Sequence, residues 1–250
     1  MTADSLLSAD GLRRRYGSLT AVDGIDLRVA PGERRALIGP NGAGKTTLLN
    51  LVGGAVRPDR GRIHFAGRDV TRLGPARRAR LGIGRIHQRP AVWPSLTALD
   101  NVVVAAWRYA GGFRRAFTPR RYDTLLRAPA RELLDRLGLA ADAGTTAAHL
   151  SHGQRRQLEI AMALAGKPRL LLLDEPAAGL AAADVHRLVD LLARLPRTVS
   201  VLLVEHRLDL VYELADAVTV LADGRHVVSG TPAEIRASRA VRDAYAEAAK

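Results

Sequence analysis

Cysteine is absent from the 250 residues of this chain, and so are long apolar runs. The apolar stretches are short, residues 170–173 being an example, whereas a membrane-spanning helix needs roughly 18 consecutive apolar residues. Residues 1–9 lack the basic start and apolar core of a secretory signal. The short apolar runs predict a protein that is soluble or peripheral to a membrane, and the missing signal predicts that it is not exported. The absence of cysteine fits a reducing compartment.

Internal repeats and low-complexity tracts are also lacking, which argues against solenoid folds and against tandem copies of one domain. A length of 250 residues with 47% hydrophobic content is enough to bury one sizeable core. We therefore expect a single domain, residues 1–250, divided into subdomains.

The formal net charge of +13 calls for an anionic partner. Nucleotide phosphates, an anionic membrane surface and nucleic acid are the candidates, and charge alone does not choose among them. The basic residues are spread from Arg13 to Arg242, which favours a general compositional feature over one patch. The densest basic and aromatic segment, residues 107–122, is a candidate surface insertion that faces lipid headgroups or a partner.

Strands dominate the expected structure of the first part of the chain. Apolar residues alternate over residues 25–29, as in a half-buried strand. Residues 36–38 form a second short strand that runs into a glycine-rich loop, followed by a helix over residues 45–52. A further strand pair is predicted over residues 58–67, where apolar residues alternate between glycines.

Helical spacing dominates residues 97–164, and a run of leucines there ends at Gly138, a predicted helix stop. Residues 170–173 and 199–204 are predicted to be buried parallel strands joined by a helix. Residues 217–228 add two short strands around a turn, and an alanine-rich helix follows. The predicted fold class is therefore α/β: a parallel sheet flanked by helices, an N-terminal antiparallel β portion and an inserted α-helical subdomain.

A glycine-rich segment between the strand at 36–38 and the following helix matches the phosphate-loop pattern. Its glycines let successive backbone N–H groups surround phosphate oxygens, and the helix N-terminus adds partial positive charge. We expect Lys45 to reach the β and γ phosphates, Thr46 to offer its hydroxyl to Mg²⁺ and Thr47 to donate to a phosphate oxygen. This predicts a phosphate-loop nucleotide hydrolase core, whose nucleotide-binding residues are Gly39, Pro40, Asn41, Gly42, Ala43, Gly44, Lys45, Thr46 and Thr47.

Two carboxylates, Asp174 and Glu175, follow the apolar strand at 170–173. Ligands bind parallel sheets at this carboxyl edge of the strands. We expect Asp174 to hold Mg²⁺, and Glu175 to polarise the attacking water as general base.

Between these two motifs, residues 150–160 resemble the signature motif of ATP-binding-cassette (ABC) ATPases, and the resemblance covers nearly the whole chain. In that family the residues that correspond to Ser151 and Gly153 lie at a helix N-terminus and bind the γ-phosphate of ATP held by the opposite subunit, as N–H groups at a helix start bind anions. Gln154 belongs to the same motif. The resemblance implies an ATP hydrolase with ATP and Mg²⁺ as cofactors, working as a homo- or heterodimer that encloses two ATP molecules.

Three further residues resemble family positions one by one. Tyr16 resembles the aromatic residue that stacks on adenine. Gln88 resembles the glutamine that touches Mg²⁺ and links the ATP site to membrane subunits. His206, directly after the strand at 199–204, resembles the switch histidine that contacts the γ-phosphate and orients Glu175 and water.

Two positions depart from the family pattern. His152 stands where the commonest signature has glycine, and Ala181 stands where an aspartate is usual. Neither change removes a group that binds phosphate or water, so we expect activity to survive.

Several stretches resemble the ATPases of branched-chain amino-acid importers and their relatives for urea and short amides: residues 36–47, 150–154, 174–180, 230–232 and 241–245. This resemblance implies transmembrane permease subunits and, indirectly, an extracytoplasmic solute-binding protein as partners. It places the chain at the cytoplasmic face of the cell membrane as a peripheral subunit.

Three alternatives stay open. Lipopolysaccharide-export ATPases are similar in size. A soluble ABC ATPase that acts on nucleic acid would suit the positive charge, but repair members carry long coiled-coil insertions and translation members carry two cassettes, so no nucleic-acid partner is expected. A nucleotide-binding regulator without turnover is disfavoured because Glu175 and His206 are both present.

Overall fold

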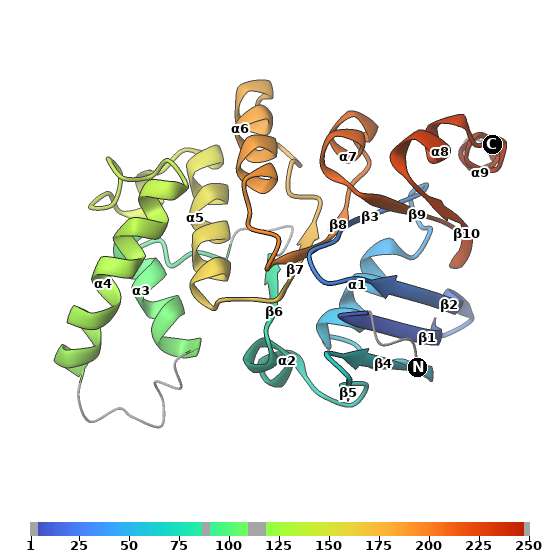
Figure 1. Ribbon diagram of the computed structural model, residues 1–250, viewed down its shortest axis with the longest axis horizontal. Helices are drawn as coiled ribbons and strands as arrows, with labels where there is room; N and C mark the ends of the chain where they lie inside the picture. The colour runs from blue at the N-terminus through green and yellow to red at the C-terminus, as the bar shows by residue number, and fades with distance from the viewer. Residues whose placement is uncertain (1–4, 87–90, 110–118, 248–250) are drawn as a thin grey trace.

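The computed structural model describes residues 5–86, 91–109 and 119–247, whose strands form two sheets (Figure 1). The first sheet is antiparallel, with strand order β2-β1-β4-β5. Gly11, with a positive φ of 57°, interrupts β1, and the register between β1 and β2 shifts at this point. The strands of this sheet are β1 Leu7–Tyr16, β2 Leu19–Val29, β4 Arg60–Phe65 and β5 Arg68–Asp69.

The second sheet has the order β10-β9-β3-β8-β7-β6. All neighbouring strands from β9 to β6 are parallel, and β10 pairs with β9 in antiparallel fashion. Because parallel strands share one direction, the loops that leave β3, β7 and β8 gather at the same edge. The bounds are β3 Arg34–Ile38, β6 Ile83–Ile86, β7 Leu170–Asp174, β8 Ser200–Val204, β9 Ala217–Ala222 and β10 Arg225–Gly230.

Both faces of the second sheet are buried, and alternate residues of β7 belong to different cores. Leu170 and Leu172 pack with the first sheet and with helix α1, Lys45–Gly53, which lies between the two sheets (Figure 1). Leu171 and Leu173 pack on the other face, against helices. A strand covered on both faces is apolar at every position, which explains the unbroken leucine run that the sequence shows.

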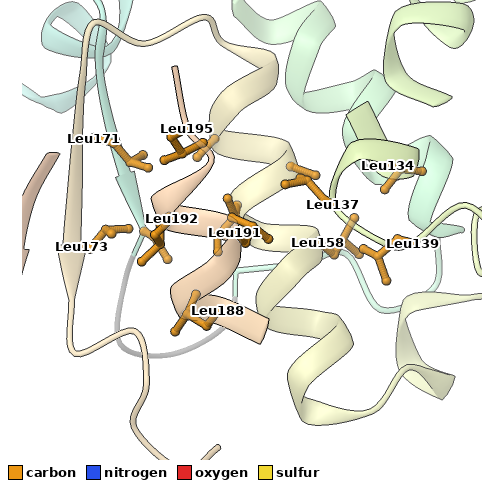
Figure 2. Close-up of a cluster of buried hydrophobic side chains, with 14 of the residues drawn as sticks. Leu134, Leu137, Leu139, Leu158, Leu171, Leu173, Leu188, Leu191, Leu192 and Leu195 are labelled. Atoms are coloured by element: carbon orange, nitrogen blue, oxygen red, sulfur yellow. The ribbon is translucent and has the colours of Figure 1, made fainter. Parts of the chain in front are cut away.

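The core on that second face joins the sheet to the helical part of the chain. Figure 2 shows leucines of β7, α5 and α6 pointing toward one another, together with leucines in and after α4. Helices α3, α4 and α5 lie together at one end of the molecule, away from the first sheet (Figure 1). These helices are α3 Ala98–Tyr109, α4 Pro119–Arg136, α5 His152–Ala165 and α6 Ala182–Ala193. In the described part of the chain, no helix combines the length and apolarity needed to cross a membrane.

The expected parallel sheet, antiparallel β portion and inserted helices are confirmed. Gly138, with a φ of 74°, follows the end of α4 as predicted. The alanine-rich C-terminal helix is two helices, α8 Pro232–Ala237 and α9 Arg239–Glu247, because the chain leaves helical geometry at Ser238. The strand pair predicted over residues 58–67 is wrong, because only β4 lies in that range and its partner β5 follows a turn at residues 66–67. Other described elements that were not predicted are β1, α2 Pro75–Leu81, β6 and α7 Leu208–Leu214.

Candidate functional site

The glycine-rich loop lies between β3 and α1, and its backbone has little room for side chains. Gly39 has a φ of 145°, and a Cβ added there would lie 2.0 Å from the carbonyl oxygen of Leu221. Gly44 has a φ of 92°, and its Cβ would lie 2.2 Å from the carbonyl oxygen of Ala21. Glycine is therefore required at both positions, as expected of a loop whose backbone N–H groups face an anion.

Lys45 crosses this loop and is 7% exposed. Its ammonium donates to the carbonyl oxygens of Gly39 and Pro40, both at 2.7 Å. Burial lowers the pKa of Lys45, while the nearby carboxylates of Glu175 and Asp174 act in the opposite direction. The structure thus brings Lys45 of the phosphate loop and the acidic residues Asp174 and Glu175 into one site.

Asp174, the last residue of β7, contacts the phosphate loop directly. Its Oδ1 lies 3.4 Å from the hydroxyl of Thr46, although 128 residues separate the two in sequence. Its Oδ2 lies 3.5 Å from a guanidinium nitrogen of Arg85, on β6. Burial lowers the pKa of Arg85, and the charge of Asp174 partly offsets that effect.

Glu175 has a φ of 46°, a left-handed conformation that is strained for a residue with a Cβ. Its backbone N–H donates to the carbonyl oxygen of Val204 at 2.9 Å, which ties it to β8. The guanidinium of Arg156 donates to the carbonyl oxygens of Glu175 (3.3 Å) and Pro176 (2.9 Å). The strained turn is therefore held from two sides.

Arg156 is paired with Glu159 on the same helix, α5, at 2.7 Å, and both side chains are buried. The other carboxylate oxygen of Glu159 accepts from the backbone N–H of Ala91 at 2.6 Å. Ala91 directly follows residues 87–90, so Gln88 lies outside the described residues. Through these contacts, the Arg156–Glu159 pair connects α5 to the loop of Glu175 and to Ala91.

The signature residues lie at the start of α5. Ser151 is the N-cap of this helix, and a capping box links its side chain and that of Gln154 to each other's backbone N–H groups. Gln154 also donates to Asp142 at 2.8 Å. A Cβ on Gly153 would lie 2.5 Å from the carboxyl carbon of Asp184, so a larger residue there would require the Asp184 side chain to move. Ser151 is exposed to solvent.

His206 and Tyr16 lie on separate elements. His206 follows β8, and its side chain is 56% exposed. Tyr16 ends β1, is 44% exposed, and has the guanidinium of Arg14 4.8 Å from its ring centre. Of the expected residues, those of the phosphate loop and the ends of β7 and β8 converge at one edge of the sheet, while Tyr16 comes from the first sheet.

The comparison with known proteins agrees with this geometry. The ABC transporter family matches residues 22–178, more than half of the chain. The chain belongs to the ABC transporter family. As a member of this family it is an ABC-type ATPase, which binds nucleotide and hydrolyses ATP.

Relatives of similar length are ATP-binding subunits. The chain is 37% identical to the high-affinity branched-chain amino acid transport ATP-binding protein BraF of Pseudomonas aeruginosa, with 96% of this chain and 97% of BraF covered. It is 35% identical to LivG of Escherichia coli K12, a protein of the same description, with the same coverage. Its structure matches the crystal structure of the ADP conformation of MJ1267, an ATP-binding cassette of an ABC transporter, with a TM-score of 0.83 and 28% identity over 97% of this chain and 98% of that one.

Beside the recognised motifs of this ABC ATPase, the sequence did not reveal the buried Arg156, Glu159 and Glu205 or the largely buried Arg85. Each lies beside a motif that was recognised, but nothing in the local sequence distinguishes it from a solvated surface charge. Their burial follows from contacts between elements far apart along the chain.

Proposed function

We propose that this ABC ATPase hydrolyses Mg²⁺-ATP at the carboxyl edge of its parallel sheet and so powers a membrane importer. The observation that carries the proposal is the contact between Thr46 and Asp174 (3.4 Å), with Lys45 and Glu175 beside it. A hydroxyl and a carboxylate are hard oxygen ligands, which Mg²⁺ prefers. The described residues contain no group of three or more His, Asp or Glu side chains that could hold a metal. Mg²⁺ needs only one or two protein ligands, because substrate phosphates and water complete its shell.

Each residue of the site then has a chemical task. Lys45 and the backbone N–H groups of residues 39–47 bind the phosphates, and Thr46 and Asp174 hold Mg²⁺, which neutralises phosphate charge when bound. Glu175 accepts the proton of the attacking water. His206 donates to the γ-phosphate and keeps Glu175 and water in place. Tyr16 stacks on adenine.

The second half of each site comes from another subunit. The capped start of α5, where Ser151 is exposed and Gly153 and Gln154 follow, offers N–H groups to the γ-phosphate of a partner's ATP. Gln88 completes the metal shell and communicates with the permease subunits. The working unit is a dimer with a second ABC ATPase, identical or different, and the chain forms one domain over residues 1–250 with its helical subdomain at about 97–164.

Branched-chain amino acids, or related small polar solutes, are the proposed cargo. The similarity to BraF and to LivG covers 96% of this chain and 97% of each relative. Both are described as branched-chain amino acid transport ATP-binding proteins. The partners are therefore transmembrane permeases and, through them, an extracytoplasmic solute-binding protein. The chain works at the cytoplasmic face of the membrane.

Glu175→Gln tests the hydrolytic site. The amide keeps the shape of the base but cannot take a proton, so turnover should fall by at least about 100-fold while ATP affinity is kept. Binding of a fluorescent ATP analogue and phosphate release measure the two effects. Turnover within about threefold of the parent would exclude Glu175 as the base. Reconstitution with candidate permeases and a binding protein of a branched-chain amino-acid importer, followed by uptake of labelled leucine and of urea, tests the cargo.

A further inference from the structure

Glu205, the first residue after β8, has a fully buried side chain whose carboxylate accepts from two loops. Its Oε1 accepts from the backbone N–H of Ala177, in the loop after β7, at 3.2 Å. Its Oε2 accepts from the backbone N–H groups of His206 (2.9 Å) and Arg207 (3.3 Å). The carboxylate therefore joins the loop that begins at Glu175 to the loop that carries His206.

The same oxygen, Oε2, lies 3.7 Å from Nδ1 of His206. The carboxylate therefore lies beside the His206 ring as well as beside the backbone that carries it.

Burying a carboxylate costs more than burying a neutral acceptor, and three backbone N–H donors from the two loops compensate that cost here. Hydrogen bonds to an ionised acceptor are stronger than those to a neutral one, so the charge strengthens the link between the loops. The other charged groups of the two loops are Glu175 and Arg207, and Arg207 pairs with Asp209 at 2.8 Å.

We propose that Glu205 is a positioning residue of the hydrolysis site. It keeps the loops of Glu175 and His206 together, and it thereby fixes the backbone from which the His206 ring reaches the γ-phosphate. The inference rests on the roles proposed above for Glu175 and His206.

Glu205→Gln tests it in the full chain. Glutamine keeps the size of the side chain but replaces one acceptor oxygen by an NH₂ donor. The backbone N–H groups of one of the two loops then face a donor, and the negative charge beside His206 is lost. The turnover number should fall at least about tenfold while the KM for ATP stays within about threefold.

Ser200→Ala is the matched control. Ser200 is buried at the opposite end of the same strand, where its hydroxyl accepts from the backbone N–H of Gly32 at 2.8 Å and lies 3.2 Å from the carbonyl oxygen of Ala30. This variant should lose stability without changing turnover by more than about twofold, because it removes buried hydrogen bonds far from the loops.

A double-mutant cycle shows whether Glu205 acts through His206. In a His206→Ala background, Glu205→Gln should reduce turnover by a clearly smaller factor than in the parent, because only its effect on the loop of Glu175 remains, whereas an independent structural role would give the same loss in both backgrounds. Equal losses, or parental turnover in Glu205→Gln alone, would overturn the inference. If Glu205→Gln does not fold, Glu205→Asp replaces it: the charge stays, but the shorter side chain cannot serve both loops, and parental turnover would again overturn the inference.

The reference variants separate this inference from the proposed function. If Glu175→Gln or His206→Ala keeps parental turnover, the proposed roles fail and the inference fails with them. If both lose turnover and Glu205→Gln does not, the inference alone is wrong.

Discussion

Arg85 and Asp174 form a mostly buried ion pair, with 3.5 Å between the guanidinium and Oδ2 and side chains 13% and 7% exposed. Asp174 ends β7, and Arg85 lies on the adjacent strand β6, which leads toward Gln88. A protein cation therefore stands beside the carboxylate to which we assign Mg²⁺. Arg85 and Mg²⁺ would both compensate the negative charge of Asp174. The contribution of Arg85 to stability should therefore be smaller when Mg²⁺ is bound.

Arg85→Met should lower the midpoint of thermal unfolding more in ATP with EDTA than in ATP with Mg²⁺. Without Mg²⁺, the variant has lost a cation next to a buried carboxylate, a cost of about 1–3 kcal/mol; with Mg²⁺, the metal supplies the charge. Differential scanning fluorimetry measures both offsets. Arg35→Met is the control, since Arg35 pairs with Glu33 (2.6 Å), away from the nucleotide. An Arg85→Met offset that is equal in both conditions would contradict the assignment of Mg²⁺ to Asp174.

The sequence predicted the site wherever a motif is local. The phosphate loop, the strand before Asp174 and the start of α5 each occupy a few consecutive residues, and their chemistry is fixed by those residue types. The buried charges are different, because an arginine in a sequence is by default a surface residue. Arg85 is buried only because β6 lies beside β7, and those strands are more than 80 residues apart in the chain.

The fold was predictable where periodicity is long and strong. The helical spacing of residues 97–164 is long enough to be distinctive. The apolar runs of β7 and β8 are short, but they are typical of parallel strands covered on both faces. Helices α2 and α7 have seven residues each, too few to show a period. Strand β1 carries three consecutive arginines at residues 13–15 and a register shift near Gly11, so its apolar alternation is interrupted.

Arg78 should be the largest single contributor to stability among the arginines of the first half of the chain. Its guanidinium is fully buried and donates to the carbonyl oxygens of Leu51 and Val52 (both 2.6 Å), Leu73 (2.9 Å) and Thr71 (3.2 Å). Arg78→Met would leave these oxygens without that donor, at a cost of about 3 kcal/mol or more. Urea unfolding measures the loss, and a cost below about 1 kcal/mol would show that water replaces the guanidinium.

This cost should not vary between about pH 6 and pH 9. Burial lowers the pKa of Arg78 to about 10, so the folded and the unfolded chain both hold the proton throughout that range. Only above the folded pKa does the unfolded chain bind more protons than the folded one, and there the stability of the parent relative to Arg78→Met should rise with pH.

The Arg156–Glu159 pair should show strong coupling between its members. Arg156→Met leaves Glu159 buried beside an apolar side chain and releases the carbonyl oxygens of Glu175 and Pro176, which should cost about 3–5 kcal/mol. Arg156→Met combined with Glu159→Leu removes both charges and should cost clearly less than the sum of the single losses. Urea unfolding of all four proteins gives the coupling energy, and additive losses would show that the charges do not depend on each other.

Ala181 offers a site where stability should increase. It is the N-cap of α6 but provides no side-chain acceptor. Ala181→Asn should stabilise the protein by about 0.5–2 kcal/mol, because the amide oxygen can accept from a free N–H of the first turn. Ala181→Gly is the comparison variant. Its free energy of unfolding should differ from that of Ala181→Asn by only a few tenths of a kcal/mol, because glycine is also a favourable N-cap residue. An unchanged unfolding midpoint in Ala181→Asn would mean that these N–H groups already have partners.

The composite nature of the site can be tested by mixing two inactive chains. Ser151→Arg places a bulky cation at the capped start of α5, where the partner's γ-phosphate is proposed to bind, but leaves its own phosphate loop intact. Lys45→Ala removes the cation that crosses the phosphate loop, so this chain should lose tight ATP binding while its α5 start stays intact. Neither chain alone can build a complete site.

In a mixed dimer, however, the phosphate loop of the Ser151→Arg chain faces the α5 start of the Lys45→Ala chain, and this one site is whole. Phosphate release should therefore reappear on mixing, with a maximum near equal concentrations, provided that the chain pairs with itself and that one occupied site closes the dimer. If the partner is a different ABC ATPase, the two substitutions must be divided between the two proteins. They then fall in the same composite site and activity should be kept, whereas both substitutions in one protein disable different sites and should abolish it. Silence of both the mixed dimer and the divided pair, with ATP binding retained by the Ser151→Arg chain, would mean that each subunit hydrolyses ATP without its partner's signature residues.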